Sequence, residues 1–207
     1  MLIKDKLWGR ETWLVNDKYC GKILELKPYF SSSYHCHKIK QETFYCLEGS
    51  FTLFYSDKLF YLTPKDEPVT IQPGEYHSFR AREPAKILEI STKHSEEDVY
   101  RKDESHKLLT YCFDLDGVIC SREKDYSKAK PDLKMIEKIN RLWDTGHRII
   151  FYTARGQTTG IDWTHVTEKQ LSIWGVRYDN LIMNKPFADF YVDDKAINVK
   201  DFGCKLQ

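Results

Sequence analysis

The chain has 207 residues, of which 41% are hydrophobic and 30% are charged. That apolar share is enough to form a buried core, so the composition excludes a wholly disordered chain. Lysine and arginine number 32 against 31 acidic residues, and the near balance holds in each half of the chain, which excludes the positive excess of a nucleic-acid or membrane-surface binder.

The sequence also lacks the marks of a membrane or secreted protein. No stretch approaches the roughly 18 consecutive apolar residues that a membrane span needs, and the N-terminus meets charge at Lys4, with no apolar signal-peptide stretch. The six cysteines show no CxxC spacing. We therefore expect a cytoplasmic protein with reduced cysteines that binds neither nucleic acid nor a membrane.

The first half of the chain, residues 1–105, has the pattern of an all-β domain. Short runs of β-branched and aromatic residues, such as 43–47 and 51–55, alternate with turn segments rich in Gly and Pro. Many short strands at this spacing favour a sandwich or a barrel. The polar segment 94–107 that ends this half is expected to be a linker or a short surface helix.

The second half, residues 106–207, alternates apolar strands with helical patterns. Apolar residues at helical spacing predict one helix between Pro131 and Gly146, and Asp162 as an N-cap predicts another that ends near Trp174. This alternation predicts a parallel sheet with crossover helices. The expected strands are 109–115, 148–152, 181–183 and 190–192.

Three histidines and a glutamate in the first half have the spacing of a metal site. His35 and His37 project from the same face of a strand, Glu42 follows after a turn, and His77 comes from a later strand after a Pro-Gly turn. Imidazoles together with a carboxylate suit borderline divalent ions. We therefore predict that these four residues bind a divalent transition metal: Zn²⁺, Fe²⁺, Mn²⁺ or Ni²⁺.

This half resembles the cupin superfamily. Its first motif appears as His-x-His, four residues, Glu, six residues and Gly, and its second as Pro-Gly-x-x-His, within a match from about Trp8 to Ser91. The resemblance implies a double-stranded β-helix, or jelly-roll barrel, and is strongest to the sugar-phosphate isomerase-like branch. Because cupins often pair through their sheets, it also implies a homodimer formed through this domain.

The metal does not fix what such a domain does. An isomerase would use it with a base such as Glu75, an oxygenase would need a redox metal, and a sugar-binding module would need neither. In each case Arg80 and Arg82 are candidate phosphate contacts near the barrel mouth.

Charged and hydroxyl side chains lie at the ends of the expected strands in the second half. Because the carboxyl ends of parallel strands meet at one edge of a sheet, we expect these groups to form a single site. Arg155 and Gly156 are candidate substrate contacts beside it. The groups are, in chain order, Asp114, Asp116, Thr153, Lys185, Asp193 and Asp194.

This arrangement resembles the haloacid-dehalogenase-like (HAD) phosphatase superfamily, from Leu109 to Phe202. The resemblance is strongest to small capless members associated with capsule and surface-polysaccharide biosynthesis. It implies an α/β HAD-like Rossmannoid parallel sheet without a cap. The 39 residues from Asp114 to Thr153 hold one crossover helix and leave no space for a cap domain.

The same resemblance implies roles for the site residues. Asp114 would form an aspartyl-phosphate, Asp116 would act as acid and then base, and Thr153 and Lys185 would hold the phosphoryl oxygens. Mg²⁺ would be the cofactor. Its ligands would be the carboxylates of Asp114 and Asp193 and the backbone carbonyl of Asp116, with Asp194 orienting them.

The sequence as a whole predicts two domains, a cupin barrel over 1–105 and a capless HAD-like phosphatase over 106–207. The main hypothesis is a Mg²⁺-dependent phosphomonoesterase for a small phosphorylated sugar or polyol in surface-glycan precursor synthesis, with a cupin that binds or isomerises the related sugar. Two alternatives stay open. One is chiefly a metal-dependent cupin sugar or sugar-phosphate isomerase or epimerase with an auxiliary phosphatase, and the other is a sugar-binding cupin with a vestigial phosphatase.

Overall fold

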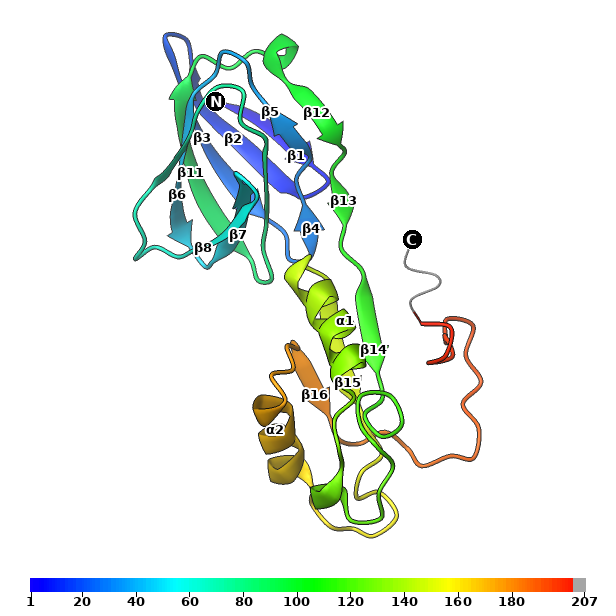
Figure 1. The fold of residues 1–207 in the computed structure, drawn as a ribbon. Helices are drawn as coiled ribbons and strands as arrows, with labels where there is room; N and C mark the ends of the chain where they lie inside the picture. Colours follow the sequence, from blue (N-terminus) through cyan, green and yellow to red (C-terminus); the bar gives the residue numbers. More distant parts are fainter. Residues whose placement is uncertain (203–207) are drawn as a thin grey trace. The chain divides into compact units, whose positions relative to one another are not determined.

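The computed structural model describes residues 1–202, which form two compact units (Figure 1). The N-terminal unit comprises residues 1–109, and the C-terminal unit begins at Thr110. Strands in the N-terminal unit pair antiparallel, whereas those in the C-terminal unit pair parallel.

The first sheet of the N-terminal unit has six strands in the order β1-β2-β3-β11-β6-β9. Its long strands alternate buried and exposed side chains, because successive residues of a pleated strand point to opposite faces. The strands are β1 (Leu2–Lys6), β2 (Gly9–Asn16), β3 (Tyr19–Leu26), β6 (Glu42–Glu48), β9 (Val69–Ile71) and β11 (Ala85–Thr92).

The second sheet of this unit has seven strands. Five follow the order β12-β5-β10-β4-β13, while β7 pairs with β10 and β8. The β7–β8 hairpin turns through Ser56 and Asp57, whose φ angles of 51° and 56° match a two-residue hairpin turn. The strands are β4 (Phe30–Ser31), β5 (Tyr34–Cys36), β7 (Phe51–Tyr55), β8 (Lys58–Leu62), β10 (His77–Arg80), β12 (Tyr100–Asp103) and β13 (His106–Lys107).

Residues 94–107 are not the linker or short surface helix that their polar composition predicts. They contain a 3₁₀ turn, η1 (Glu96–Asp98), followed by strands β12 and β13. Strand β12 pairs with β5, and β13 pairs with β4. Backbone pairing of this kind needs no apolar side chains, so a charged segment can complete a sheet edge.

The inward face of the first sheet carries apolar side chains at one end of its strands and charged side chains at the other. Leu24, Ile87 and Cys46 lie side by side on adjacent strands and belong to the apolar core. Farther along the same face, Lys22 lies opposite Glu89 on the neighbouring strand, and both are buried. The unit therefore has an apolar core at one end and a buried polar region at the other.

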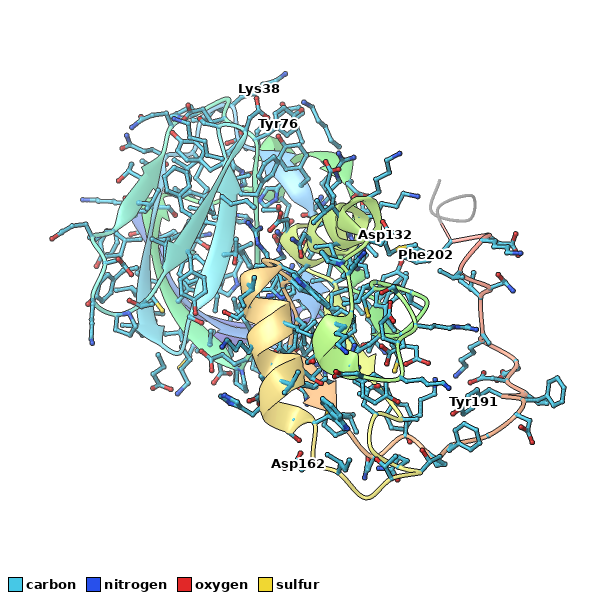
Figure 2. All side chains as sticks on the ribbon, turned by 60° about the horizontal axis from the view of Figure 1, so that its bottom comes forward. Lys38, Tyr76, Asp132, Asp162, Tyr191 and Phe202 are labelled. Atoms are coloured by element: carbon cyan, nitrogen blue, oxygen red, sulfur yellow. The ribbon has the colours of Figure 1, made fainter. Side chains whose placement is uncertain are left out.

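The C-terminal unit contains a three-stranded parallel sheet in the order β14-β15-β16 and two α-helices. Asp132 caps the first helix by accepting a hydrogen bond from the backbone N–H of Met135, and Asp162 accepts one from Thr164 at the start of the second (Figure 2). The elements are β14 (Thr110–Phe113), η2 (Tyr126–Lys128), α1 (Leu133–Asp144), β15 (Arg148–Tyr152), α2 (Thr164–Ile173) and β16 (Asn180–Ile182).

The predicted HAD-like Rossmannoid sheet is wrong. Residues 183–202 contain no helix or strand, so the expected strand at 190–192 does not form. Phe190 and Val192 are 87% and 99% exposed, and Tyr191 lies on this irregular segment (Figure 2). Three apolar residues between aspartates are too few to hold a strand that has no neighbour to pair with. The described chain is mostly β-sheet with two α-helices, and its main architecture is that of a cupin-like β domain.

None of the helices among residues 1–202 combines the length and the apolar character that crossing a bilayer requires.

Candidate metal centre

Three histidines and a glutamate meet in the polar region of the N-terminal unit. His35 on β5 lies directly opposite His77 on β10, His37 follows the end of β5, and Glu42 opens β6. The four ligand atoms that these side chains offer lie within 4.8 Å of one another. The structure thus brings together all four residues that the sequence singles out as metal ligands.

All three imidazole rings are oriented by backbone carbonyl groups. Nδ1 of His35 donates a hydrogen bond to the carbonyl oxygen of Ser33 (3.0 Å), Nδ1 of His37 to that of Asp98 (2.9 Å), and Nδ1 of His77 to that of Glu75 (3.1 Å). Because a carbonyl can only accept, each neutral ring carries its proton on Nδ1. The lone pair on each Nε2 is left for a metal, which is the usual way that proteins prepare histidine ligands.

Two of the four ligand atoms are buried without ordinary hydrogen bonds. Nε2 of His77 lies 2.7 Å and Nε2 of His37 3.6 Å from Oε1 of Glu42. Neither Nε2 of His77 nor Oε1 of Glu42 has a partner with hydrogen-bond geometry. Buried polar atoms are rarely left so, and a cation among them would satisfy both. The donor set of three nitrogens and one oxygen fits a transition metal.

The electrostatics keep the site in the state that binds cations. Burial, together with the neighbouring His77, lowers the pKa of His35 to about 3. Burial also lowers the pKa of His37. For Glu42, burial alone would raise the pKa, but Lys40 and the two histidines hold it well below its usual range. Near neutral pH, His35 and His37 are therefore neutral and the carboxyl group is ionised.

Asp98 shapes the loop that joins His37 to Glu42. Its carboxylate accepts hydrogen bonds from the backbone N–H groups of Lys38, Ile39 and Lys40 at 2.9–3.2 Å. Its backbone carbonyl orients His37. The sequence analysis assigned no role to this residue, because its partners lie about 60 positions away and no local motif marks them.

The sequence analysis also missed three buried charged residues beside Glu42. Lys22, Lys40 and Glu89 are each 3–4% exposed. Lys40 contacts both Glu42 and Glu89, and Lys22 contacts Glu89 at 3.3 Å. The sequence did hold one sign of them: Lys22 and Glu89 stand at inward-facing positions of strands in which buried and exposed residues alternate. Charged side chains are almost never fully buried unless they are paired, so each of these positions implies a buried partner.

The ligands line a cavity of about 270 Å³ within the N-terminal unit. Lys6 and Arg101 also line it, as do several carboxylates, whereas Arg80, Arg82 and Glu75 are not among its lining residues. Glu75, the expected base, instead accepts hydrogen bonds from the Tyr55 hydroxyl and the Gln72 backbone. The cationic groups that line the cavity are Lys6 on β1, Lys22 on β3, Lys40 before β6 and Arg101 on β12.

In the C-terminal unit, the residues predicted from strand ends form two separate pairs. Nζ of Lys185 contacts Oδ2 of Asp114 at 2.9 Å. Arg155 donates two hydrogen bonds to Asp116, at 2.7 and 2.9 Å, and is itself only 3% exposed. Thr153 is buried, and its hydroxyl accepts a hydrogen bond from the Arg155 backbone.

The remaining predicted residues lie elsewhere in this unit. Asp193 and Asp194 are exposed on the irregular segment after β16, and Asp193 accepts a hydrogen bond from the backbone of Lys195. Gly156 has a φ of +85°, and a Cβ there would lie 2.2 Å from the carbonyl oxygen of Ile161, so the turn requires glycine. Within residues 1–202, these aspartates form no metal-ligating cluster, and the predicted Mg²⁺ is not supported.

Two antiparallel sheets around a three-histidine, one-glutamate cluster give the N-terminal unit the architecture of a cupin-like β domain. No protein-family model matches the sequence, and no curated protein matches it. Similarity is found among solved structures, and in each of those described below it covers less than half of this chain.

The capsular polysaccharide assembling protein CapF from Staphylococcus aureus matches with 18% identity and a TM-score of 0.45, covering 49% of this chain and 31% of CapF. KdgF from Halomonas sp. matches with 12% identity and a TM-score of 0.43, covering 47% of this chain and 92% of KdgF. A cupin-2 domain containing protein from Shewanella frigidimarina matches with 22% identity and a TM-score of 0.37, covering 44% and 85%. The chain thus spans about a third of the length of CapF.

The predicted phosphatase is also wrong. None of these three structures is named as a phosphatase. The fourth strand, which was to end in Asp193 and Asp194, is absent from the described residues.

Proposed function

We propose that the N-terminal unit binds a divalent transition metal through His35, His37, Glu42 and His77, and that it isomerises or epimerises a small phosphorylated sugar. The observation that carries the proposal is the shared orientation of the three rings, whose Nδ1 atoms are all held by carbonyl groups. The four ligand atoms then meet beside a cavity of about 270 Å³. When bound, the metal would act as a Lewis acid on a carbonyl or hydroxyl oxygen.

The cavity supplies groups that can bind a phosphate. Arg101 on β12 lies directly opposite His35 on β5, so the two side chains leave the sheet on the same face. Lys6 also lines the cavity. An arginine fork suits the phosphate or carboxylate of an anionic sugar. We therefore propose that Arg101 and Lys6 contact the phosphate, in place of Arg80 and Arg82.

Carboxylates in the same cavity can move a proton. Glu11 and Glu104 both line it, together with the metal ligands. An isomerase needs a base within hydrogen-bond reach of the carbon-bound proton it removes. We propose Glu104 for that task, because Tyr55 and Gln72 already engage Glu75, and Trp13 and Lys6 engage Glu11.

The test is proton exchange in deuterated water. The metal-loaded protein is incubated with a panel of aldose and ketose phosphates, and exchange at the carbon beside the carbonyl is followed by NMR. We expect exchange with at least one compound, and a KM raised about tenfold or more in Arg101→Gln, since a charge-assisted hydrogen bond is lost. Arg10→Gln is the matched control, because Arg10 pairs with Asp5 outside the cavity. Absence of exchange with the whole panel would reject the isomerase.

A sugar-binding domain without catalysis is the second candidate. It is favoured by the engagement of Glu75, which leaves the expected base occupied. In that case the same panel would bind, with heat measurable by calorimetry, but no proton would exchange. The biological setting we propose for either activity is surface-glycan precursor synthesis, in keeping with the name of the similar capsular polysaccharide assembling protein.

A further inference from the structure

Four charged side chains are buried together at one side of the proposed metal centre. Lys22, Lys40, Glu42 and Glu89 are each 2–4% exposed. Lys22 on β3 lies opposite Glu89 on β11, while Glu42 on β6 lies opposite Ser91, two residues farther along β11. The sheet register therefore places Lys22, Glu89 and Glu42 in adjoining rows of its inward face, and Lys40 lies on the loop just before β6.

Lys40 connects this cluster to the proposed metal ligand. Its ammonium contacts Oε2 of Glu42 and lies 2.6 Å from Oε1 of Glu89. Lys22 contacts the same Glu89 oxygen at 3.3 Å and lies 4.5 Å from the ring centroid of Trp13. The Lys40 backbone is fixed too, since its N–H donates to Asp98 at 2.9 Å. Both ends of Lys40 are thus held.

The two oxygens of Glu42 face different partners as a result. Oε2 accepts from Lys40, whereas Oε1 faces His77 at 2.7 Å and His37 at 3.6 Å. Only Oε1 is without a hydrogen bond. A carboxylate held in this way can offer one oxygen to a cation but not both.

We infer that Lys40 is a positioning residue that makes Glu42 a one-oxygen metal ligand, with Glu89 holding the Lys40 ammonium in place. The inference rests on the proposed metal-binding function. Lys40 also offsets the charge of Glu42, and Lys22 offsets that of Glu89. The positive charge of a bound metal is then left for an anionic ligand to balance, which agrees with a phosphorylated or enolised sugar as substrate.

The experiment uses Co²⁺ as the probe, because its visible spectrum reports coordination number and its affinity is measured by the same titration. The variants of the full chain are Lys40→Met and, as the matched control, Lys22→Met, which removes a buried lysine of the same cluster that does not touch Glu42. We expect Lys40→Met to bind Co²⁺ about 10- to 100-fold more weakly, as happens when a group that orients a metal ligand is lost. Its spectrum should also shift toward a higher coordination number. Lys22→Met should keep the wild-type spectrum.

If Lys40 has only a structural role, Lys40→Met will have a lower unfolding midpoint but the wild-type Co²⁺ spectrum and affinity. That result would overturn the inference. If Lys40→Met does not fold, Lys40→Gln keeps a donor to Glu42 but removes the charge. It is expected to bind Co²⁺ about tenfold more weakly, and unchanged affinity would again overturn the inference. Failure of the wild-type protein to bind Co²⁺ would instead reject the proposed metal function on which the inference rests.

Discussion

Nδ1 of His37 donates a hydrogen bond to the backbone carbonyl of Asp98, 61 residues later in the chain. The carboxylate of Asp98 in turn accepts hydrogen bonds from the three consecutive backbone N–H groups that follow His37. One residue of the η1 turn thus orients a proposed metal ligand and shapes the loop that leads to the next one. The polar segment after β11 therefore helps to build the candidate metal centre.

Asp98→Ala should weaken both the fold and the proposed metal site. Three backbone N–H groups lose a charged acceptor, so we expect the free energy of unfolding to fall by about 1–3 kcal/mol. Metal affinity should fall as well, because the loop no longer presents Lys40 and Glu42 in fixed positions. Urea unfolding of the metal-free protein and a metal titration measure the two effects. Asp103→Ala, at an exposed aspartate, is the control, and equal midpoints for the two variants would contradict the account.

His77→Ala should abolish stoichiometric metal binding. It removes one of four ligand atoms that lie within 4.8 Å of one another, so we expect affinity for Zn²⁺ to fall by roughly 100-fold or more. His106→Ala provides the comparison, because His106 is exposed on β13 and is not among the four ligands. Elemental analysis after dialysis gives the metal content of each protein. Equal metal content in the two variants would show that His77 is not a ligand.

The sequence was informative where spacing within one strand or turn fixes the chemistry. His35 and His37 share a strand face by the two-residue period, and the Pro-Gly turn precedes His77. The convergence of these segments follows from the antiparallel pairing of β5 and β10. What the sequence could not show was the set of partners around the ligands. Lys40, Glu89 and Asp98 act through contacts between distant segments that no local pattern encodes.

The second half shows the opposite case. The two helices and three of the strands lie within a few residues of their predicted bounds. The expected fourth strand fails, because an apolar run of three residues forms a strand only if a neighbour pairs with it. The ends of the strands that do form contribute two ion pairs, Lys185 with Asp114 and Arg155 with Asp116.

The metal-free protein should lose stability as the pH falls from about 6.5 to 4.5. Burial lowers the pKa of His35 to about 3, and burial together with Lys22 and Lys40 lowers that of His94 to about 4. In this window both rings are neutral in the folded state and take up protons in the unfolded chain, whose histidines have a pKa near 6.5. The unfolded state therefore binds more protons, and stability rises with pH by up to about 1.4 kcal/mol per pH unit for each such group.

Urea midpoints of chelator-treated protein across this range measure the slope. His94→Gln removes one of the two groups and should make the dependence shallower. A midpoint that does not change over the window would mean that the two rings are not kept neutral by the fold. Ionisation of Glu42 does not enter here, because its lowered pKa places its contribution at more acidic pH.

Arg155 should prove to be the most sensitive charged residue of the C-terminal unit. Its guanidinium donates to Asp116, to the Thr167 hydroxyl at 3.1 Å and to the Gln170 side chain at 2.8 Å, all while 3% exposed. Arg155→Met leaves Asp116 without its cation and two buried polar groups without a donor. We expect a loss of about 3–5 kcal/mol, the usual cost of breaking a buried ion pair from one side.

Arg141→Ala is the matched control for this prediction. Arg141 pairs with Glu137 one helical turn away, and both side chains are more than half exposed. Such pairs contribute about 0.3–0.5 kcal/mol, so this variant should unfold close to the wild type. Urea unfolding of both variants is monitored by tryptophan fluorescence. Trp143, Trp163 and Trp174 report on the C-terminal unit, and the N-terminal tryptophans contribute to the same signal. Equal losses would mean that the buried network around Arg155 contributes no more than a surface ion pair.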